Sequence, residues 1–188
     1  QRKILLFLGR LENHKGIIEL IEAWSQLSIE SRKAGWVLVI SGFGSLTKYV
    51  EKLSNKKNSN IIFIGQSSGE KKKHILNISK AFILPSRGEG LPIAVLEALS
   101  YKNMCLLTNE CNLQKLFEKN IALKISKNSQ NIKKVLIELF DYSNDKILQA
   151  GEKGYDYVKE KHDWNKIAKE TKVFYKKLYM GKLSRQSI

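Results

Sequence analysis

The sequence from Ala81 to Ser100 reads AFILPSRGEGLPIAVLEALS, and it holds the unit that decides the fold: an apolar run, a glycine-containing loop and a second apolar segment. The run Ala81 to Leu84 is continuous rather than alternating, which is typical of a strand buried on both faces of a parallel sheet. Gly88 and Gly90 allow a ligand to approach the backbone closely, and Pro92 suits the first turn of a helix. We therefore expect a buried strand, a ligand-binding loop and a helix that begins near Pro92.

Five further apolar runs alternate with segments of helical spacing. The runs are Ile4 to Leu8, Trp36 to Ile40, Ile61 to Ile64, Met104 to Leu107 and Ile121 to Ile125. This alternation predicts an α/β fold: a Rossmann-like, open, mostly parallel six-stranded sheet with helices on both faces and right-handed crossovers. C-terminal helices follow, at about 145–159 and 165–180. We expect one domain over residues 1–180 and a disordered tail over 181–188.

The composition limits the classes of function. The chain has 188 residues, with 33 Lys plus Arg against 18 Asp plus Glu and a formal net charge of +15. Three anionic partners fit such a charge: nucleic acid, a membrane surface and a phosphorylated small molecule. No apolar run approaches the roughly 20 residues of a membrane helix, and nothing resembles a signal peptide. Two cysteines, Cys105 and Cys111, fit a reduced setting, so we expect a cytoplasmic protein.

The loop between Pro85 and Pro92 follows a predicted strand, and in open α/β sheets ligands bind outside the carboxyl ends of strands. The helix that begins there directs free N–H groups and the positive end of its dipole outward, which favours a phosphate. Glu97 lies in an otherwise apolar helix, where an unpaired buried carboxylate costs on the order of several kcal/mol. Glu97 is therefore paired with a neighbouring lysine, solvated at the edge of the helix, or bonded to a ligand hydroxyl. Glu89 is either a solvated loop acid or a ligand contact.

Two other loops follow predicted strands. In the stretch FLGRLENHKG, Arg10 and Lys15 would give a diphosphate two charge-assisted partners, although alone they are equally two solvated loop cations. The stretch Gly42-Phe43-Gly44 lacks the third glycine of a nicotinamide-binding fingerprint. It is therefore a tight turn or a place where the backbone approaches a ligand.

The sequence resembles the C-terminal, donor-binding half of a GT-B glycosyltransferase of the retaining glycosyltransferase family 4, the group 1 glycosyl transferases. The resemblance rests on GRLENHKG, SGFG, FIGQ and, above all, on the two glutamates separated by seven residues in PSRGEGLPIAVLEALS. The stretch HDWNKIAKETKVFYKKLY resembles the closing helix of these enzymes. The resemblance implies transfer of a hexose from a UDP- or GDP-sugar to a cell-envelope glycan or lipid, as polysaccharide and lipopolysaccharide biosynthesis require.

The resemblance also implies roles for individual residues. Arg10 and Lys15 bind the donor diphosphate, and Glu89 faces the donor sugar; these are the implied catalytic residues. The implied donor-binding positions are Gly9, Gly42, Gln66, Gly90, Leu91, Ile93 and Glu97. Among them Glu97 accepts hydrogen bonds from the nucleotide ribose. No protein nucleophile and no metal are expected, since fixed cations take the place of a metal, and the nucleotide sugar is a co-substrate.

The sequence departs from the family pattern in two places. The usual Gly-x-Pro after the second glutamate is Lys102-Asn103-Met104, which we expect to affect packing only. A usual Gly-Gly is Cys111-Asn112, and this change would present Glu110 or Asn112 to the substrate. The resemblance further implies an N-terminal acceptor-binding domain that these residues do not include. We therefore expect the chain alone to bind a nucleoside diphosphate and to transfer no sugar.

Two alternatives remain from other classes of protein. A non-catalytic nucleotide-binding or interaction domain of the same fold is disfavoured by the intact charged residues of the motifs. A nucleic-acid-binding module would explain the net charge, but it requires exposed aromatic residues between its cations. The aromatic residues lie instead on apolar patterns: Trp24, Trp36, Phe63 and Phe82. We expect no nucleic-acid partner, and we expect a peripheral contact with the anionic inner face of a membrane.

Overall fold

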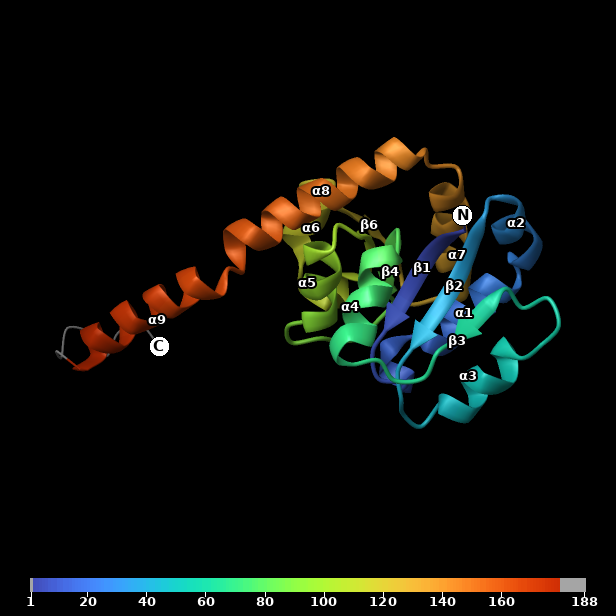
Figure 1. The fold of residues 1–188 in the computed structure, drawn as a ribbon, viewed down its shortest axis with the longest axis horizontal. Helices are drawn as coiled ribbons and strands as arrows, with labels where there is room; N and C mark the ends of the chain where they lie inside the picture. The colour runs from blue at the N-terminus through green and yellow to red at the C-terminus, as the bar shows by residue number, and fades with distance from the viewer. Residues whose placement is uncertain (1, 180–188) are drawn as a thin grey trace.

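The computed structural model describes residues 2–179, and at its centre lies a six-stranded sheet (Figure 1). The strands are β1 (Lys3–Leu8), β2 (Trp36–Ser41), β3 (Ile61–Phe63), β4 (Ala81–Leu84), β5 (Met104–Leu107) and β6 (Ala122–Lys124). Their order in the sheet is β3-β2-β1-β4-β5-β6, and every neighbouring pair is parallel. The Rossmann-like α/β fold is confirmed, and the sheet is wholly rather than mostly parallel.

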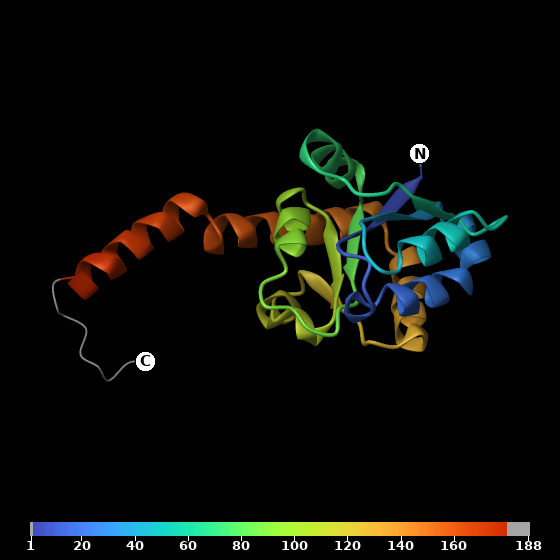
Figure 2. The same cartoon turned by 90° about the horizontal axis from the view of Figure 1, so that it is seen from below.

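Helices connect the strands and cover both faces of the sheet (Figure 2). They are α1 (Ile17–Ser25), α2 (Ser28–Lys33), α3 (Thr47–Ser54), α4 (Gly69–Ile78), α5 (Ile93–Ser100), α6 (Gln114–Glu118), α7 (Ser129–Phe140), α8 (Asn144–Lys161) and α9 (Trp164–Tyr179). The crossovers from β1 to β2 and from β4 to β5 run in opposite directions, so right-handed connections place α1 and α5 on opposite faces. α1 packs against α7, and α5 packs against α8.

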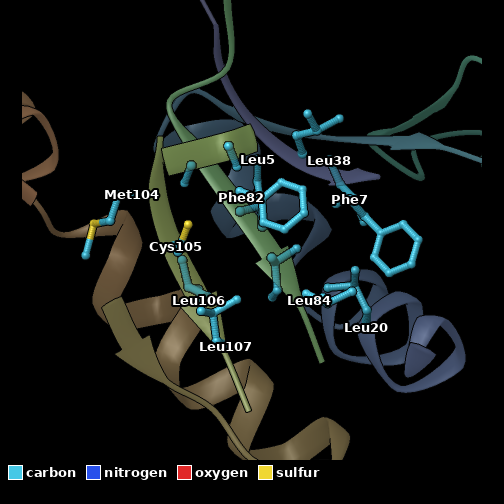
Figure 3. Packing of buried hydrophobic residues seen from close by; sticks show 14 of the residues in the cluster. Leu5, Phe7, Leu20, Leu38, Phe82, Leu84, Met104, Cys105, Leu106 and Leu107 are labelled. Carbon is cyan, nitrogen blue, oxygen red and sulfur yellow. The ribbon is translucent and has the colours of Figure 1, made fainter. Parts of the chain in front are cut away.

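The core lies between the sheet and these helices. Figure 3 shows buried side chains of the central strands packed together, among them Leu5, Phe82 and Leu106, none of which has exposed surface. On the α1 face, the ring of Trp24 meets that of Phe140 edge-on, with 5.7 Å between their centroids. Each large apolar side chain that leaves water stabilises the fold by about 1.5–3 kcal/mol. The four central strands are buried as predicted.

The two edge strands differ from the prediction of strands buried on both faces. Ile62 of β3 is 46% exposed, and Lys124 of β6 is exposed. An edge strand has one neighbour instead of two, so its side chains are covered less completely. The short helices α2 and α6 were not predicted, because each buries a single residue, Ser31 and Leu116 respectively, and shows no apolar periodicity.

The position of the site follows from the strand order. The order reverses between β1 and β4, so the connections from these strands lead away in opposite directions, and ligands of open α/β sheets bind outside the carboxyl ends of the strands at such a switch point. The loop after β1 runs from Gly9 to Gly16, and the loop after β4 runs from Pro85 to Pro92. α5 begins at Ile93, directly after Pro92 as expected. The two predicted charged motifs therefore face each other at one edge of the sheet.

α9 projects away from the body of the domain, as Figures 1 and 2 both show. None of its residues is buried, and Trp164 and Tyr179 are 79% and 94% exposed. The two predicted C-terminal helices are present with bounds shifted by a residue or two, whereas the expected tail over 181–188 lies outside the described residues. Between residues 2 and 179, no helix is long and apolar enough to cross a membrane.

Candidate functional site

Glycines allow the loops at the carboxyl edge to touch through their backbones. Gly16 has φ +70, and a Cβ there would lie 2.1 Å from the carbonyl oxygen of Pro85. A Cβ on Gly42 would lie 1.9 Å from the carbonyl oxygen of Gly9. No larger residue fits at either position without movement of the backbone. The loop after β1 is thus packed directly against the loops after β4 and β2.

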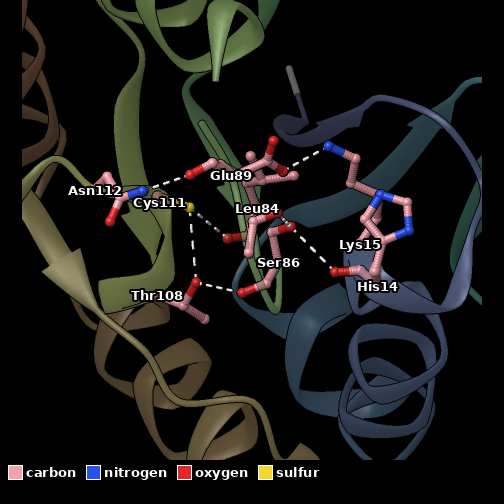
Figure 4. A network of polar contacts seen from close by, with 9 residues as sticks. His14, Lys15, Leu84, Ser86, Glu89, Thr108, Cys111 and Asn112 are labelled. Atoms are coloured by element: carbon pink, nitrogen blue, oxygen red, sulfur yellow. Dashed lines mark hydrogen bonds and ion pairs between the residues drawn. The ribbon is translucent and has the colours of Figure 1, made fainter. Parts of the chain in front are cut away.

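An ion pair joins the loops after β1 and β4. The ammonium of Lys15 donates to Oε1 of Glu89 over 2.6 Å, and Figure 4 shows the two side chains pointing toward each other from opposite loops. The side chains are only 16% and 10% exposed. Glu89 is therefore not a solvated loop acid. Removal of either partner would leave a largely buried charge unpaired, which costs far more than loss of a surface pair.

The loop that carries Glu89 is anchored by buried polar contacts (Figure 4). Ser86 Oγ donates to the carbonyl oxygen of His14 over 3.1 Å, and Thr108 Oγ1 donates to the carbonyl oxygen of Ser86 over 2.6 Å. Cys111 Sγ lies 3.6 Å from Thr108 Oγ1. Burial raises the pKa of the Cys111 thiol, so this free cysteine is a neutral packing group.

The Cys111-Asn112 departure acts on the backbone of Glu89. Asn112 has φ +56, a conformation that asparagine tolerates, and its side-chain amide donates to the carbonyl oxygen of Glu89. The N–H of Glu89 donates to the carbonyl oxygen of Glu110 over 2.9 Å. The carboxylate of Glu110 pairs with Lys127 at 2.6 Å, and this hydrogen bond lowers the pKa of Glu110. Both side chains considered as substrate contacts are therefore engaged within the protein.

Sequence reasoning missed a second link between the two charged loops. The N–H of Arg87 donates to the carbonyl oxygen of His14 over 2.7 Å, and its guanidinium pairs with Glu19 of α1. These contacts hold the loop of Glu89 against the segment that carries Lys15. Arg87 and Glu19 are 68 positions apart, so no local pattern connects them.

Glu97 has a partner from a different element. The ammonium of Lys72, on α4, donates to Oε1 of Glu97, on α5, over 2.6 Å. The side chains are 31% and 32% exposed, so a ligand can still reach the pair. A lysine partner, one of the alternatives that the sequence left open, is therefore present, and a contact with a ligand hydroxyl stays a prediction. This lysine was not identified in advance, because it is one of three consecutive lysines, 71–73.

A groove of about 320 Å³ lies at the carboxyl ends of β1 and β2 and in the loop after β3. It is lined by Leu8, Gly9, Arg10, Ser41, Gly42, Phe43, Gln66 and Ser67. Four predicted site residues thus share one groove. The other predicted positions lie at the start of α5: Gly90 is exposed, and Leu91 and Ile93 are 52% and 54% exposed.

A larger hollow of about 880 Å³ lies along α9. It is lined by Trp164, Ile167, Ala168, Thr171, Lys172, Tyr175, Lys176 and Tyr179, all of one helix. Because a single helix forms it, this hollow is an uncovered apolar face rather than a ligand cavity. Within residues 2–179, no group of three or more His, Cys, Asp or Glu side chains is placed to hold a metal ion.

Known proteins share this sequence pattern. A family model described as "Glycosyl transferases group 1" matches residues 1–171. The "Putative teichuronic acid biosynthesis glycosyltransferase TuaC" of Bacillus subtilis is 29% identical over 168 residues, which cover 89% of this chain and 40% of the relative. The chain spans less than half the length of the curated relatives it matches.

Solved structures share the fold. A sucrose-phosphate synthase from Thermosynechococcus elongatus superposes with a TM-score of 0.83 at 19% identity, covering 96% of this chain and 46% of that one. The C-terminal domain of a "Glycosyl Transferase Group 1 Family Protein (LpcC)" from Francisella tularensis gives a TM-score of 0.72 at 22% identity, covering 86% of this chain and 87% of that one. The expected fold, one half of a GT-B architecture, is confirmed.

Proposed function

The chain belongs to the group 1 glycosyltransferases, and from that premise we propose that it is the donor-binding domain of a retaining enzyme that uses a UDP- or GDP-hexose. The observation that carries the proposal is the Lys15–Glu89 pair at the carboxyl ends of β1 and β4, where the strand order reverses. Ligands of open α/β sheets bind in a crevice at such a switch point. The pair presents one group of each sign where a diphosphate and a sugar would meet.

The chemistry follows from the charges at this edge. As the sugar departs from the nucleotide, negative charge gathers on the leaving diphosphate and the sugar acquires oxocarbenium character. Arg10, Lys15 and the N-terminus of α5 stabilise the negative charge where it develops. Glu89 faces the sugar and favours its positive character. Neither Glu89 nor Glu97 acts as a covalent nucleophile in this proposal.

Binding of the donor requires an exchange of partners. A diphosphate in the crevice would attract the Lys15 ammonium, which in the present structure is held by Glu89. The base lies in the groove beside Gln66, and Gly9 and Gly42 allow the backbone to approach it closely. Glu97 accepts a hydrogen bond from the ribose with the carboxylate oxygen that Lys72 leaves free.

The acceptor site lies in a second, N-terminal domain in this proposal. Two observations support it: the matched relatives are more than twice as long, and the apolar face of α9 is uncovered. We assign that face to contact with the second domain. A cell-envelope glycan or lipid acceptor is supported by the name of the teichuronic acid relative. The net charge of +15 supports a cytoplasmic enzyme in peripheral contact with an anionic membrane surface.

Thermal unfolding of the chain with UDP, GDP, ADP and their sugars tests the proposal. A ligand that binds only the folded state adds about 2.7 kcal/mol at 100 times its dissociation constant. We expect UDP or GDP to raise the melting temperature in this way, and we expect no transfer to glycan or lipid acceptors by the chain alone. No shift with any of these nucleotides, with tighter binding of an oligonucleotide, would contradict the proposal.

A further inference from the structure

We propose that Lys72 binds the donor together with Glu97: the ammonium and the carboxylate jointly hydrogen-bond the two neighbouring hydroxyls of the nucleotide ribose. This inference rests on the proposed function, because it assumes that a ribonucleotide occupies the carboxyl edge. The family resemblance gave a role to Glu97 and none to Lys72.

The placement of Lys72 carries the inference. It lies in the first turn of α4, which begins at Gly69, and Glu97 lies in the middle of α5. α4 follows the loop of Gln66, and α5 follows the loop of Glu89, so both helices start at the carboxyl edge. The Lys72–Glu97 pair therefore joins the base side of the site to the sugar side.

The two neighbouring lysines have other partners. Lys71 Nζ donates to the carbonyl oxygen of Ile64 over 2.7 Å. Lys73 pairs with Glu70 at 2.7 Å on the same helix, where the side chains are 59% and 88% exposed. Of the three consecutive lysines, Lys72 alone contacts a predicted donor-binding residue, and its pair is more buried than that of Lys73.

The hydrogen-bonding capacity of the pair matches a vicinal diol. Lys72 occupies Oε1 of Glu97, which leaves Oε2 to accept from one hydroxyl. The ammonium has three donors, and the two not directed at Glu97 can donate to the oxygen of the adjacent hydroxyl. A carboxylate alone only accepts, so it cannot satisfy the oxygens of the diol. The hydrogen bond from Lys72 also holds the Glu97 carboxylate in one orientation.

A phosphate contact is a less suitable role for Lys72. The carboxylate of Glu97, 2.6 Å from the ammonium, would repel a phosphate at the same place. Lys15, Arg10 and the start of α5 offer positive charge elsewhere along the edge. The two roles differ in what they predict for ligands without ribose hydroxyls, and this difference defines the experiment.

The test is calorimetric titration of Lys72→Met and of the matched control Lys73→Met on the full 188-residue chain. The ligands are UDP and GDP, their 2′,3′-dideoxy forms and inorganic pyrophosphate. We expect Lys72→Met to weaken the preferred ribonucleotide about tenfold, equivalent to about 1.4 kcal/mol. The dideoxy form and pyrophosphate should bind this variant as they bind the unaltered chain, Lys72→Arg should recover part of the loss, and Lys73→Met should change nothing.

Three other results would overturn either the role of Lys72 or the proposed function. Equal binding of the ribonucleotide to Lys72→Met and Lys73→Met, with both variants folded by circular dichroism, would show that the Lys72 pair is structural only. An equal loss for the ribonucleotide, the dideoxy form and pyrophosphate would assign Lys72 to phosphate. If neither UDP nor GDP bound the unaltered chain, the proposed function would fail first, and this inference with it.

Discussion

All strands of the sheet run in one direction, so their amino ends form one edge (the amino edge) and their carboxyl ends the other (the carboxyl edge). Both edges are rich in lysine and arginine, but they are built differently. At the amino edge, a hollow of about 480 Å³ is lined by four cations, Arg2, Lys3, Lys80 and Lys102, and it is larger than the groove of about 320 Å³ at the carboxyl edge. One of these cations, Lys102, pairs with Glu152 of α8, and this pair is half exposed, with each side chain at 46%. Cationic charge and hollow size therefore do not distinguish a ligand site from a surface.

What distinguishes the carboxyl edge is buried pairing and backbone contact between loops. The amino-edge turns before β2, β3, β5 and β6 are short and contain Gly35, Asn60, Lys102 and Asn120, all with positive φ. Such residues end helices and leave little room for a ligand. Lys102, the first residue of the stretch Lys102-Asn103-Met104, lies at this edge, away from the candidate site. The expectation that this stretch affects packing only stays a prediction.

The largest effect on stability is expected when a glycine at either edge of the sheet is replaced by alanine. Gly16→Ala adds a Cβ 2.1 Å from a carbonyl oxygen at φ +70, and Gly151→Ala adds one 2.0 Å from the carbonyl oxygen of Lys102. We expect losses in unfolding free energy of about 2–5 kcal/mol and about 1–3 kcal/mol respectively, measured in urea. Under conditions in which both are folded, Gly151→Ala should bind UDP or GDP normally and Gly16→Ala should not. Weak binding by folded Gly151→Ala would show that the amino edge contributes to the site.

The next largest effect is expected on nucleoside diphosphate affinity, when the residues proposed to contact phosphate are replaced. Lys15→Ala and Arg10→Ala should each weaken nucleoside diphosphate binding by about 1.5–3 kcal/mol in calorimetry, because each removes a charge-assisted contact. Free uridine or guanosine should bind almost unchanged. The control is Lys80→Ala, an exposed cation of the amino edge, which should have no effect. If the two mutants lost the free nucleoside as strongly as the diphosphate, the assignment to phosphate would be wrong.

Substitutions of the two glutamates should differ in which ligand they affect. Glu97→Gln should weaken the bare diphosphate and the intact donor alike, by about 1–3 kcal/mol, since one charged hydrogen-bond acceptor is replaced. Glu89→Gln should not weaken the bare diphosphate, because it releases the Lys15 ammonium to contact the phosphates. In the two-domain enzyme it should lower turnover on the order of a hundredfold, if its charge favours the oxocarbenium-like state. Loss of the bare diphosphate by Glu89→Gln, with its retention by Glu97→Gln, would reverse the roles.

The smallest expected effect lies outside both edges, at the junction of α8 and α9. Burial lowers the pKa of His162 below the usual value of about 6.5. As the pH falls through that value, the unfolded chain binds the proton before the folded chain does, so stability decreases on acidification. Urea unfolding at pH 7.5 and 5.5 should show this decrease, and His162→Gln should reduce it. An unchanged decrease in His162→Gln would assign it to other groups.

The parts of the site that depend on chain direction could be predicted from the sequence. Because parallel strands end at one edge, the loops that carry Lys15 and Glu89, 74 positions apart, were both expected at that edge, although the ion pair between the two side chains was not. Pro92 and the apolar residues after it indicated where α5 begins. These inferences need only the strand order and the local propensity of the chain.

The side-chain partners could not be predicted in the same way. Lys72 is one of three consecutive lysines, and only the packing of α4 beside α5 selects it for Glu97. Asn112 supports the backbone of Glu89 through a positive φ that the sequence does not reveal. The exposure of Ile62 depends on β3 being an edge strand, which follows from the tertiary arrangement rather than from its apolar run.

A titration of the isotopically labelled chain with UDP and GDP, followed through its backbone amide signals in NMR, shows directly which edge of the sheet binds the nucleotide. We expect the preferred diphosphate to shift amide signals in the loops at 9–16, 42–44 and 65–67 and in the segment 88–97, all at the carboxyl edge. Signals of Lys80 and Lys102 at the amino edge should stay in place. Shifts centred on the amino edge or on α9, with the carboxyl-edge loops unaffected, would contradict the proposed binding at the carboxyl edge.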